Sequence, residues 1–201
     1  MVNWTSALCV WDGIVEAESA ENKTSKIPVV WKGTWVLNED APDASKVKEP
    51  PRNAFLRDCD SDKHFSVSGT AQLASGTDAS NLFQPFQASF TKGEGYDLNG
   101  AKHTDEEHEV LFEKLRWSGG EARKNLVYAC GRNEYGNFIS VGWMRPGNRL
   151  TLARRYLEES DPRAKWGVEM VKDRVLKEIY SEEDDLIVIP PWQCEVFNTE
   201  P

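Results

Sequence analysis

The sequence predicts a mainly β protein: an antiparallel up-and-down β-barrel followed by one C-terminal α-helix. Short runs of strand-forming residues separated by turn residues fill the stretch from about 29 to 156, and helical periodicity is weak there. A helical spacing of apolar residues begins only after Asp161. We therefore expect a single domain over residues 1–201, with the barrel at about 29–156.

Length and charge limit the function. A chain of 201 residues fits one domain and can bury a hydrophobic core without disulfides or metals. Its 33 acidic and 24 basic residues give a formal net charge of −9. Because nucleic acid and anionic membranes select basic surfaces, this charge argues against both as partners. No run approaches the about 18 apolar residues that a membrane span needs.

The N-terminal segment has neither the basic region nor the long apolar core of a secretory signal. We expect a cytoplasmic protein, with a removed signal as the alternative. Cys9, Cys59, Cys130 and Cys194 lie far apart and form no metal-binding spacing. Four free thiols are favoured over two disulfides.

Seven runs form the predicted sheet: 29–37, 65–73, 86–90, 110–117, 126–130, 138–143 and 150–156. The last three are joined by the short connectors 131–136 and 145–148, both rich in turn residues. Short connections between successive strands make a meander, and closing the meander into a barrel removes exposed strand edges.

The run 150–156 places one arginine on each side of the sheet. Strand alternation puts Arg154 on the face of Leu150 and Leu152, and puts Arg155 on the opposite face. An arginine inside a barrel needs a partner or an aromatic face, since an unpaired buried cation is costly.

The remaining segments are loops, a helix and a tail. Prolines make 38–53 irregular, and 75–81 is a polar hairpin connection. Asp161 and Pro162 begin a helix at about 162–180, whose apolar stripe should pack on the barrel or seal one end. An acidic segment and an extended tail follow, with 186–192 as an edge strand closed off by prolines.

Lys32-Gly33-Thr34-Trp35 resembles the Gly-x-Trp signature that opens the barrel in the calycins, the superfamily of lipocalins, fatty-acid-binding proteins and avidins. The resemblance implies a barrel of about eight to ten strands with an interior ligand site. It also implies that Trp35 packs across one end of the barrel against a basic residue from near the last strand. Arg154 and Arg155 stand at a comparable place. A C-terminal helix, common in lipocalins, fits as well.

Two local clusters look reactive but have simpler interpretations. The cluster 103–109 holds two histidines and four acids, yet His103 and His108 are not at the i, i+4 spacing of a helical metal site, so a solvated acidic loop is favoured. The segment 93–96 lacks the helix and lysine of a phosphate loop, so a glycine-rich bulge or hairpin is favoured, with Asn99-Gly100 as a further turn.

Our leading functional hypothesis is a non-enzymatic binding module that takes a small apolar molecule or a short peptide end. The candidate ligand-binding residues are Trp35, Arg132, Tyr135, Arg154 and Arg155. We predict no catalytic residues, no metal and no cofactor. The connector that carries Arg132 and Tyr135 is either a recognition loop or an ordinary turn.

Two alternatives stay open. The first is a protein-interaction or scaffold subunit with a filled barrel, motivated by Trp4, Trp11 and Trp192, which we expect to be exposed. The second is a barrel isomerase or hydrolase, which two titratable groups with shifted pKa values in one cavity would favour. Nothing in the sequence calls for an enzyme.

Overall fold

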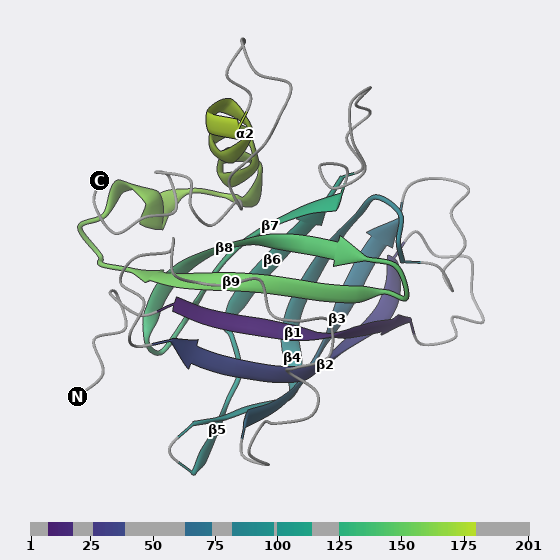
Figure 1. Ribbon diagram of the computed structural model, residues 1–201. Coiled ribbons are helices and arrows are strands. Elements are labelled where there is room, and N and C mark those ends of the chain that lie inside the picture. The colour runs from purple at the N-terminus through teal and green to yellow at the C-terminus, as the bar shows by residue number, and fades with distance from the viewer. Residues whose placement is uncertain are drawn as a thin grey trace.

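The computed structural model describes residues 8–17, 26–38, 63–73, 82–98, 100–113 and 125–179. Its elements, in chain order, are the strands β1 (Leu8–Ala17), β2 (Lys26–Asn38), β3 (His64–Leu73), β4 (Phe86–Leu98), β5 (Ala101–His103), β6 (Glu107–Phe112), β7 (Leu126–Asn133), β8 (Gly136–Arg145) and β9 (Arg149–Leu157), the 3-10 turn η4 (Pro162–Lys165) and the helix α2 (Val168–Ile179). They form a curved β-barrel with the helix beside it (Figure 1).

The sheet closes on itself. Strands follow the order β3-β2-β1-β9-β8-β7-β6-β4, and a further pairing of β3 with β4 joins the two ends into an eight-stranded barrel. Every pairing is antiparallel, and β5 is a short extension that pairs only with β4. The predicted fold class, an antiparallel up-and-down barrel with a C-terminal helix, is confirmed.

Strand β1 extends the barrel beyond its predicted start near residue 29. It lies between β2 and β9, where Trp11 pairs with Trp35 on one side and with Leu152 on the other. Asp12 and Gly13 interrupt the apolar pattern of this segment, which hid the strand from periodicity. In the barrel Asp12 faces outward, where it accepts hydrogen bonds from Arg149 Nε at 3.0 Å and Thr151 Oγ1 at 2.5 Å.

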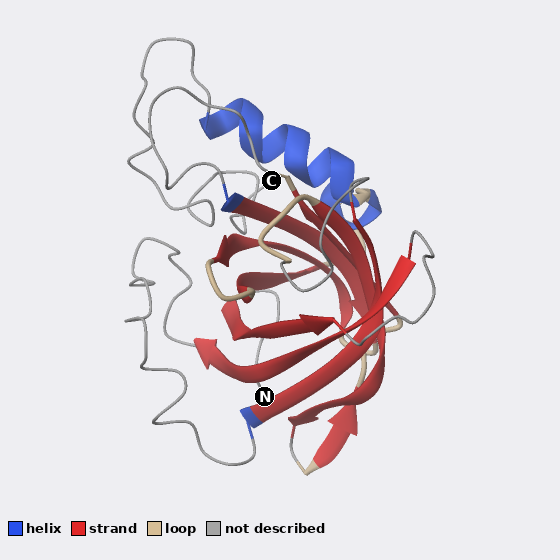
Figure 2. Cartoon of the chain, turned by 90° about the vertical axis from the view of Figure 1, so that its right-hand side faces the viewer, coloured by secondary structure: helices blue, strands red, loops and turns tan. Residues whose placement is uncertain are grey.

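The predicted helix at 162–180 begins with a separate turn. Asp161 caps η4 by accepting a hydrogen bond from the backbone N–H of Arg163 at 2.8 Å, with Pro162 at the first position. The helix α2 then presents Val168, Val171 and Val175 to the outer face of the barrel wall, where they are buried. Figure 2 shows the helix along the outside of the barrel, as the apolar stripe predicted.

Glycines bend β4, as the sequence predicted. Gly93 and Gly95 have φ values of 105° and 71°, and the pairing of β4 with β3 shifts register nearby. A Cβ on Gly95 would come within 1.9 Å of the His103 carbonyl oxygen. The bulge therefore depends on glycine. Beyond it, the end of β4 pairs with β5.

Several predicted segments lie outside the described residues: most of the 38–53 loop, the whole 75–81 connection, the end of the 110–117 run, and the tail with its edge strand at 186–192. The single-domain assignment stays a prediction. Within the described residues, Cys9 and Cys130 are free thiols. No described helix has the length and apolar character to cross a membrane.

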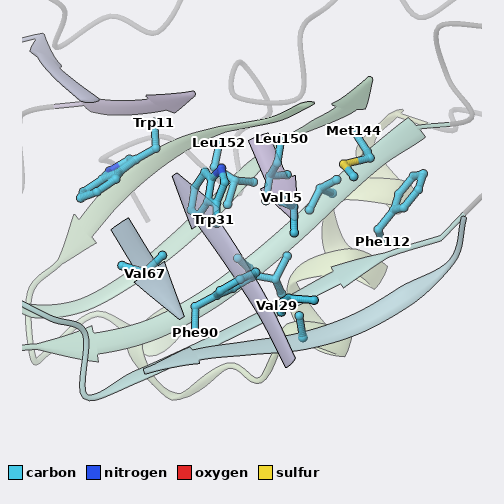
Figure 3. Close-up of a cluster of buried hydrophobic side chains, with 14 of the residues drawn as sticks. Trp11, Val15, Val29, Trp31, Val67, Phe90, Phe112, Met144, Leu150 and Leu152 are labelled. Atoms are coloured by element: carbon cyan, nitrogen blue, oxygen red, sulfur yellow. The ribbon is translucent and has the colours of Figure 1, made fainter. Parts of the chain in front are cut away.

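Alternation along the strands separates two sets of buried side chains. One set fills the barrel interior, and Figure 3 shows part of it, with Trp11, Leu150 and Leu152 on one side and Val67 and Phe90 on the other. The second set lies outside the barrel, beneath α2, and includes Leu111, Leu126 and Tyr128.

Candidate binding site at the polar end of the barrel

The barrel interior has two chemically different ends. At the end where β1 begins and β2 finishes, the interior residues are polar or aromatic, and we call this the polar half. It is defined by Trp11, Trp31, Trp35, Tyr96, Asp105, His108, Asn133, Ser140, Arg154 and Tyr156. At the opposite end they are apolar; we call this the apolar half and define it by Val15, Val29, Phe86, Phe112, Met144 and Leu150.

Arg154 lies at the centre of the polar half. Its position in β9 points it inward, and only 2% of it is exposed. Two of its nitrogens donate to the two oxygens of Asp105, Nη1 to Oδ1 at 3.0 Å and Nη2 to Oδ2 at 2.7 Å. Its guanidinium also lies 3.7 Å from the ring centre of Phe138 and 4.7 Å from that of Trp11. The sequence predicted that an interior arginine would need a partner or an aromatic face, and Arg154 has both.

Asp105 reaches the interior from the short segment between β5 and β6. Burial raises the pKa of its carboxyl, but the Arg154 charge and the neighbouring His108 outweigh burial and hold the pKa well below its usual range. For Arg154, burial lowers the pKa, and the charge of Asp105 more than reverses this effect. The two residues form a fully charged pair inside the barrel.

Asn133, at the end of β7, links this pair to two tyrosines. Its amide nitrogen lies 2.9 Å from the Tyr96 hydroxyl, 2.8 Å from the Tyr156 hydroxyl and 2.9 Å from Asp105 Oδ1. Its amide oxygen accepts a hydrogen bond from the backbone N–H of Tyr135 at 2.9 Å. The network therefore fixes both the interior and the turn that follows β7.

His108 is the titratable neighbour of this pair. Its Nδ1 atom lies 3.1 Å from Asp105 Oδ2, and its ring contacts Phe138 at 5.4 Å between ring centres. Burial lowers the pKa of the imidazole, and the opposing pull of Asp105 does not offset it. At neutral pH, His108 is therefore uncharged.

Several interior polar atoms have no hydrogen-bond partner among the described residues. They are the indole nitrogens of Trp11, Trp31 and Trp35, the Nε of Arg154, the Nε2 of His108 and the hydroxyl of Ser140. Strand β8 places Ser140 directly beside Arg154 in the register of β8 and β9. Buried polar groups in proteins are nearly always satisfied by protein, water or ligand, so this concentration is unusual.

Three residues lie at the rim of the polar half. Tyr135, in the two-residue turn between β7 and β8, places its hydroxyl 3.2 Å from His103 Nε2. His103 in turn contacts Glu134 through Nδ1. Tyr135 also packs edge-on against Tyr156, at 6.4 Å between ring centres. The turn is thus connected directly to the interior.

Of the five predicted ligand-binding residues, the structure brings Trp35, Tyr135 and Arg154 to the polar half. Arg132 points away from the interior and pairs with Glu106 and Glu107 on the surface. Arg155 is buried on the outer side of β9, opposite Arg154. Two of the five candidates therefore do not face the interior.

The aromatic partner of the interior arginine differs from the one that the family resemblance implied. Arg154 lies over Trp11, whereas Trp35 stacks on Trp11 with 5.7 Å between ring centres and packs edge-on against Tyr96 at 6.0 Å. Because β1 was not predicted as a strand, Trp11 could not be proposed for this position. The expectation that Trp11 is exposed is wrong, since the strand turns its side chain into the barrel, while Trp4 and Trp192 lie outside the described residues.

Sequence reasoning missed most of the polar half. The expectation of a solvated acidic loop at 103–109 is wrong for Asp105 and His108, which are buried, although Glu106 and Glu107 are exposed. The usable signal was that one arginine of the 150–156 run must face the interior, because a buried arginine needs a partner. Within the described ranges, no three histidine, cysteine or acidic side chains lie close enough together to hold a metal ion.

Comparison of the chain with known protein families, curated proteins and solved structures found no match.

Proposed function

We propose that this protein is a non-enzymatic binding module with a calycin-like barrel, and that it takes a small molecule at the polar half. The observation that carries the proposal is the group of buried donors without acceptors in the polar half, namely the indole N–H groups of Trp11, Trp31 and Trp35 and the Nε–H of Arg154. Binding sites combine apolar walls with a few polar groups that fix the ligand, and this region has both.

Energetics support a ligand. A buried donor left without a partner costs about 1–3 kcal/mol, so four such donors would use up a large part of the about 5–15 kcal/mol by which a domain is stable. A small molecule or ordered water that accepts from them removes this cost. Trp35, Tyr135 and Arg154 are our proposed ligand-binding residues from the sequence, and Trp11 and Trp31 join them.

The two other functions have weaker support. A scaffold subunit with a filled barrel is consistent with the close interior packing, such as Trp31 against Phe65 at 4.7 Å between ring centres. A barrel isomerase or hydrolase is consistent with the neighbouring Asp105 and His108. We prefer binding because both Asp105 oxygens already accept hydrogen bonds from Arg154, which leaves the carboxylate poorly placed as a base.

Thermal unfolding of the full chain with a panel of small aromatic molecules, fatty alcohols and short peptides tests the proposal. A ligand present at about 100 times its Kd stabilises the folded state by about 2.7 kcal/mol, which raises Tm by roughly 5–10 °C in a chain of this size. The indole N–H resonances of 15N-labelled protein locate the site. The indole N–H chemical shift of Trp11, Trp31 or Trp35 should change on binding. The chemical shift of Trp143, which lies on the opposite face of β8 from Ser140, should not change.

Failure of every compound in the panel to raise Tm, together with unmoved indole resonances, would refute small-molecule binding and leave the scaffold function as the better explanation.

A further inference from the structure

The chemistry of the unpaired groups in the polar half specifies what a ligand there must provide. The three indole nitrogens and Arg154 Nε are obligate donors. Ser140 Oγ can donate or accept, whereas the neutral His108 ring carries its proton on Nδ1, beside Asp105, so its Nε2 only accepts. Five of these six atoms can therefore be satisfied by an acceptor, and four of them by nothing else.

The carboxylate and amide oxygens of the polar half are already used. Asp105 Oδ1 and Oδ2 accept from Arg154, and Asn133 Oδ1 accepts from the Tyr135 backbone. Their partners are themselves buried or fixed in a turn. A ligand that mainly donates hydrogen bonds would compete for these oxygens and leave the indole groups unpaired, so the balance favours a ligand rich in acceptors.

The charges of the polar half are also balanced. Arg154 and Asp105 cancel each other at 2.7 Å, His108 is neutral, and burial raises the pKa of Tyr96 and Tyr156 so that both hydroxyls stay protonated. Burial likewise raises the pKa of the Cys9 thiol to about 12. An anionic ligand would have to break the Arg154–Asp105 pair or remain an uncompensated buried charge, and both are costly.

The surroundings of the donors are aromatic. Trp11 is in contact with Trp35, Phe65 and Tyr96, at 5.7, 5.0 and 4.9 Å between ring centres. Trp31 contacts Phe65 and Phe90. Flat rings pack favourably against such faces and edges, whereas a flexible chain would lose conformational entropy when ordered there.

We infer that the ligand of the polar half is an uncharged aromatic molecule that presents carbonyl or ether oxygens to the indole N–H groups of Trp11, Trp31 and Trp35. This inference rests on the proposed function and narrows it to one chemical class. It assigns the Arg154–Asp105 pair to positioning and charge balance rather than to direct capture of an anion.

Three probes of matched size test the class: acetophenone is uncharged with a carbonyl acceptor, ethylbenzene is uncharged without one, and benzoate is an anion. Each is titrated into the 15N-labelled full chain while the indole N–H resonances are followed, with assignments from Trp11→Phe, Trp31→Phe, Trp35→Phe and Trp143→Phe. We expect saturable binding of acetophenone, with a downfield shift of at least one interior indole proton and a Kd at least about tenfold lower than for the other two probes.

Paired variants separate hydrogen bonding from packing. Trp35→Phe keeps an aromatic ring but removes the N–H, so it should reduce the preference for acetophenone over ethylbenzene. Trp143→Phe, on the outer face, should leave that preference unchanged. Spectra of each variant without probe show whether it is folded. If Trp35→Phe is not folded, Trp31→Phe and Trp11→Phe provide the same comparison.

The outcomes distinguish this inference from the proposed function. Binding of benzoate or ethylbenzene as tightly as acetophenone would overturn the acceptor class while leaving a binding site in the barrel. Absence of binding by all three probes, with another compound of the panel bound, would also overturn the class. Failure of the entire panel would overturn the proposed function itself.

Discussion

The two halves of the barrel interior are built from the same strands but stabilised differently. Strand β9 supplies Leu150 and Leu152 toward the apolar half and Arg154 and Tyr156 to the polar half. The apolar half depends on packing, as where Phe112 meets Phe86 at 5.8 Å between ring centres. The polar half depends on an ion pair, an amide and two tyrosines whose partners must all be present.

This difference shows where the barrel tolerates change. Packing of apolar side chains is non-directional and loses free energy in proportion to the volume removed. A buried charge pair is an all-or-none arrangement, since removing one member leaves the other uncompensated. The buried area therefore does not by itself predict which half loses more stability on substitution. The number of hydrogen-bond and ion-pair partners that a residue has predicts it better.

The largest expected effect is in the polar half. Asp105→Ala leaves the Arg154 charge buried without its partner and should lower the free energy of unfolding by about 3–5 kcal/mol. Glu107→Ala, which removes an exposed partner of Arg132, should cost about 0–1 kcal/mol. Urea denaturation measures both. Similar losses for the two variants would contradict the charged pair in the interior.

In the apolar half, Leu150→Ala should cost about 2–5 kcal/mol through lost burial and the cavity left behind. Ile14→Ala, at a half-exposed position on the outer face of β1, should change stability by no more than about 0.5 kcal/mol. The double variant Leu150→Ala/Asp105→Ala tests whether the two halves contribute independently to stability. Losses of unfolding free energy that add up support independence, and a strongly non-additive loss contradicts it.

A pH dependence should come from the polar half. The pKa of His108 lies below its ordinary value of 6.5 in the folded protein, so the unfolded chain binds the proton first. Stability should therefore fall as pH drops through 6.5, by up to about 1.4 kcal/mol per pH unit. A second loss should begin below pH 3.8, where Asp105 protonates more readily in the unfolded chain.

Denaturation of the wild type and His108→Gln from pH 8 to pH 5 isolates this contribution, because His64 and His103 are present in both proteins. The variant should have the shallower pH dependence. Equal slopes for the two proteins would mean that His108 is not held neutral by burial.

The smallest effect is expected at Ser140. Its buried hydroxyl has no partner among the described residues, so Ser140→Ala should be neutral or slightly stabilising in the absence of ligand. Thr151→Val removes a hydroxyl that donates to the buried Asp12 and should cost about 1–3 kcal/mol. If Ser140→Ala is as damaging as Thr151→Val, water or another group already satisfies Ser140.

The sequence predicted the barrel and three residues at the polar half, namely Trp35, Tyr135 and Arg154. Alternation placed Arg154 and Arg155 on opposite faces of the sheet without saying which face is the interior, and turn chemistry gave the connections between β7, β8 and β9. The partners of Arg154 were not predictable in this way. Asp105 is 49 residues from Arg154, and Asn133 is 28 residues from Asp105.

The acidic neighbours of Asp105 also masked it, because Glu106 and Glu107 are exposed. Strand β1 was hidden for a related reason. In the sequence Asp12 interrupts the apolar pattern of the strand, and only the folded structure shows that Arg149 and Thr151 donate hydrogen bonds to it.

The seam between β1 and β9 joins the first and last strands of the barrel. Asp12 and Arg149 are 137 residues apart in sequence, and Cys9 pairs with Arg154 across the same seam. At about 5–20 residues per second, a ribosome needs on the order of ten seconds to make the intervening chain. Until β9 is made, the edge of β1 that faces it has no hydrogen-bonded partner, and the Trp11 ring is not covered by the Arg154 guanidinium. Contacts so distant in sequence slow folding, so barrel closure should be a late, slow step, and truncation before β9 would leave an open sheet edge prone to aggregation.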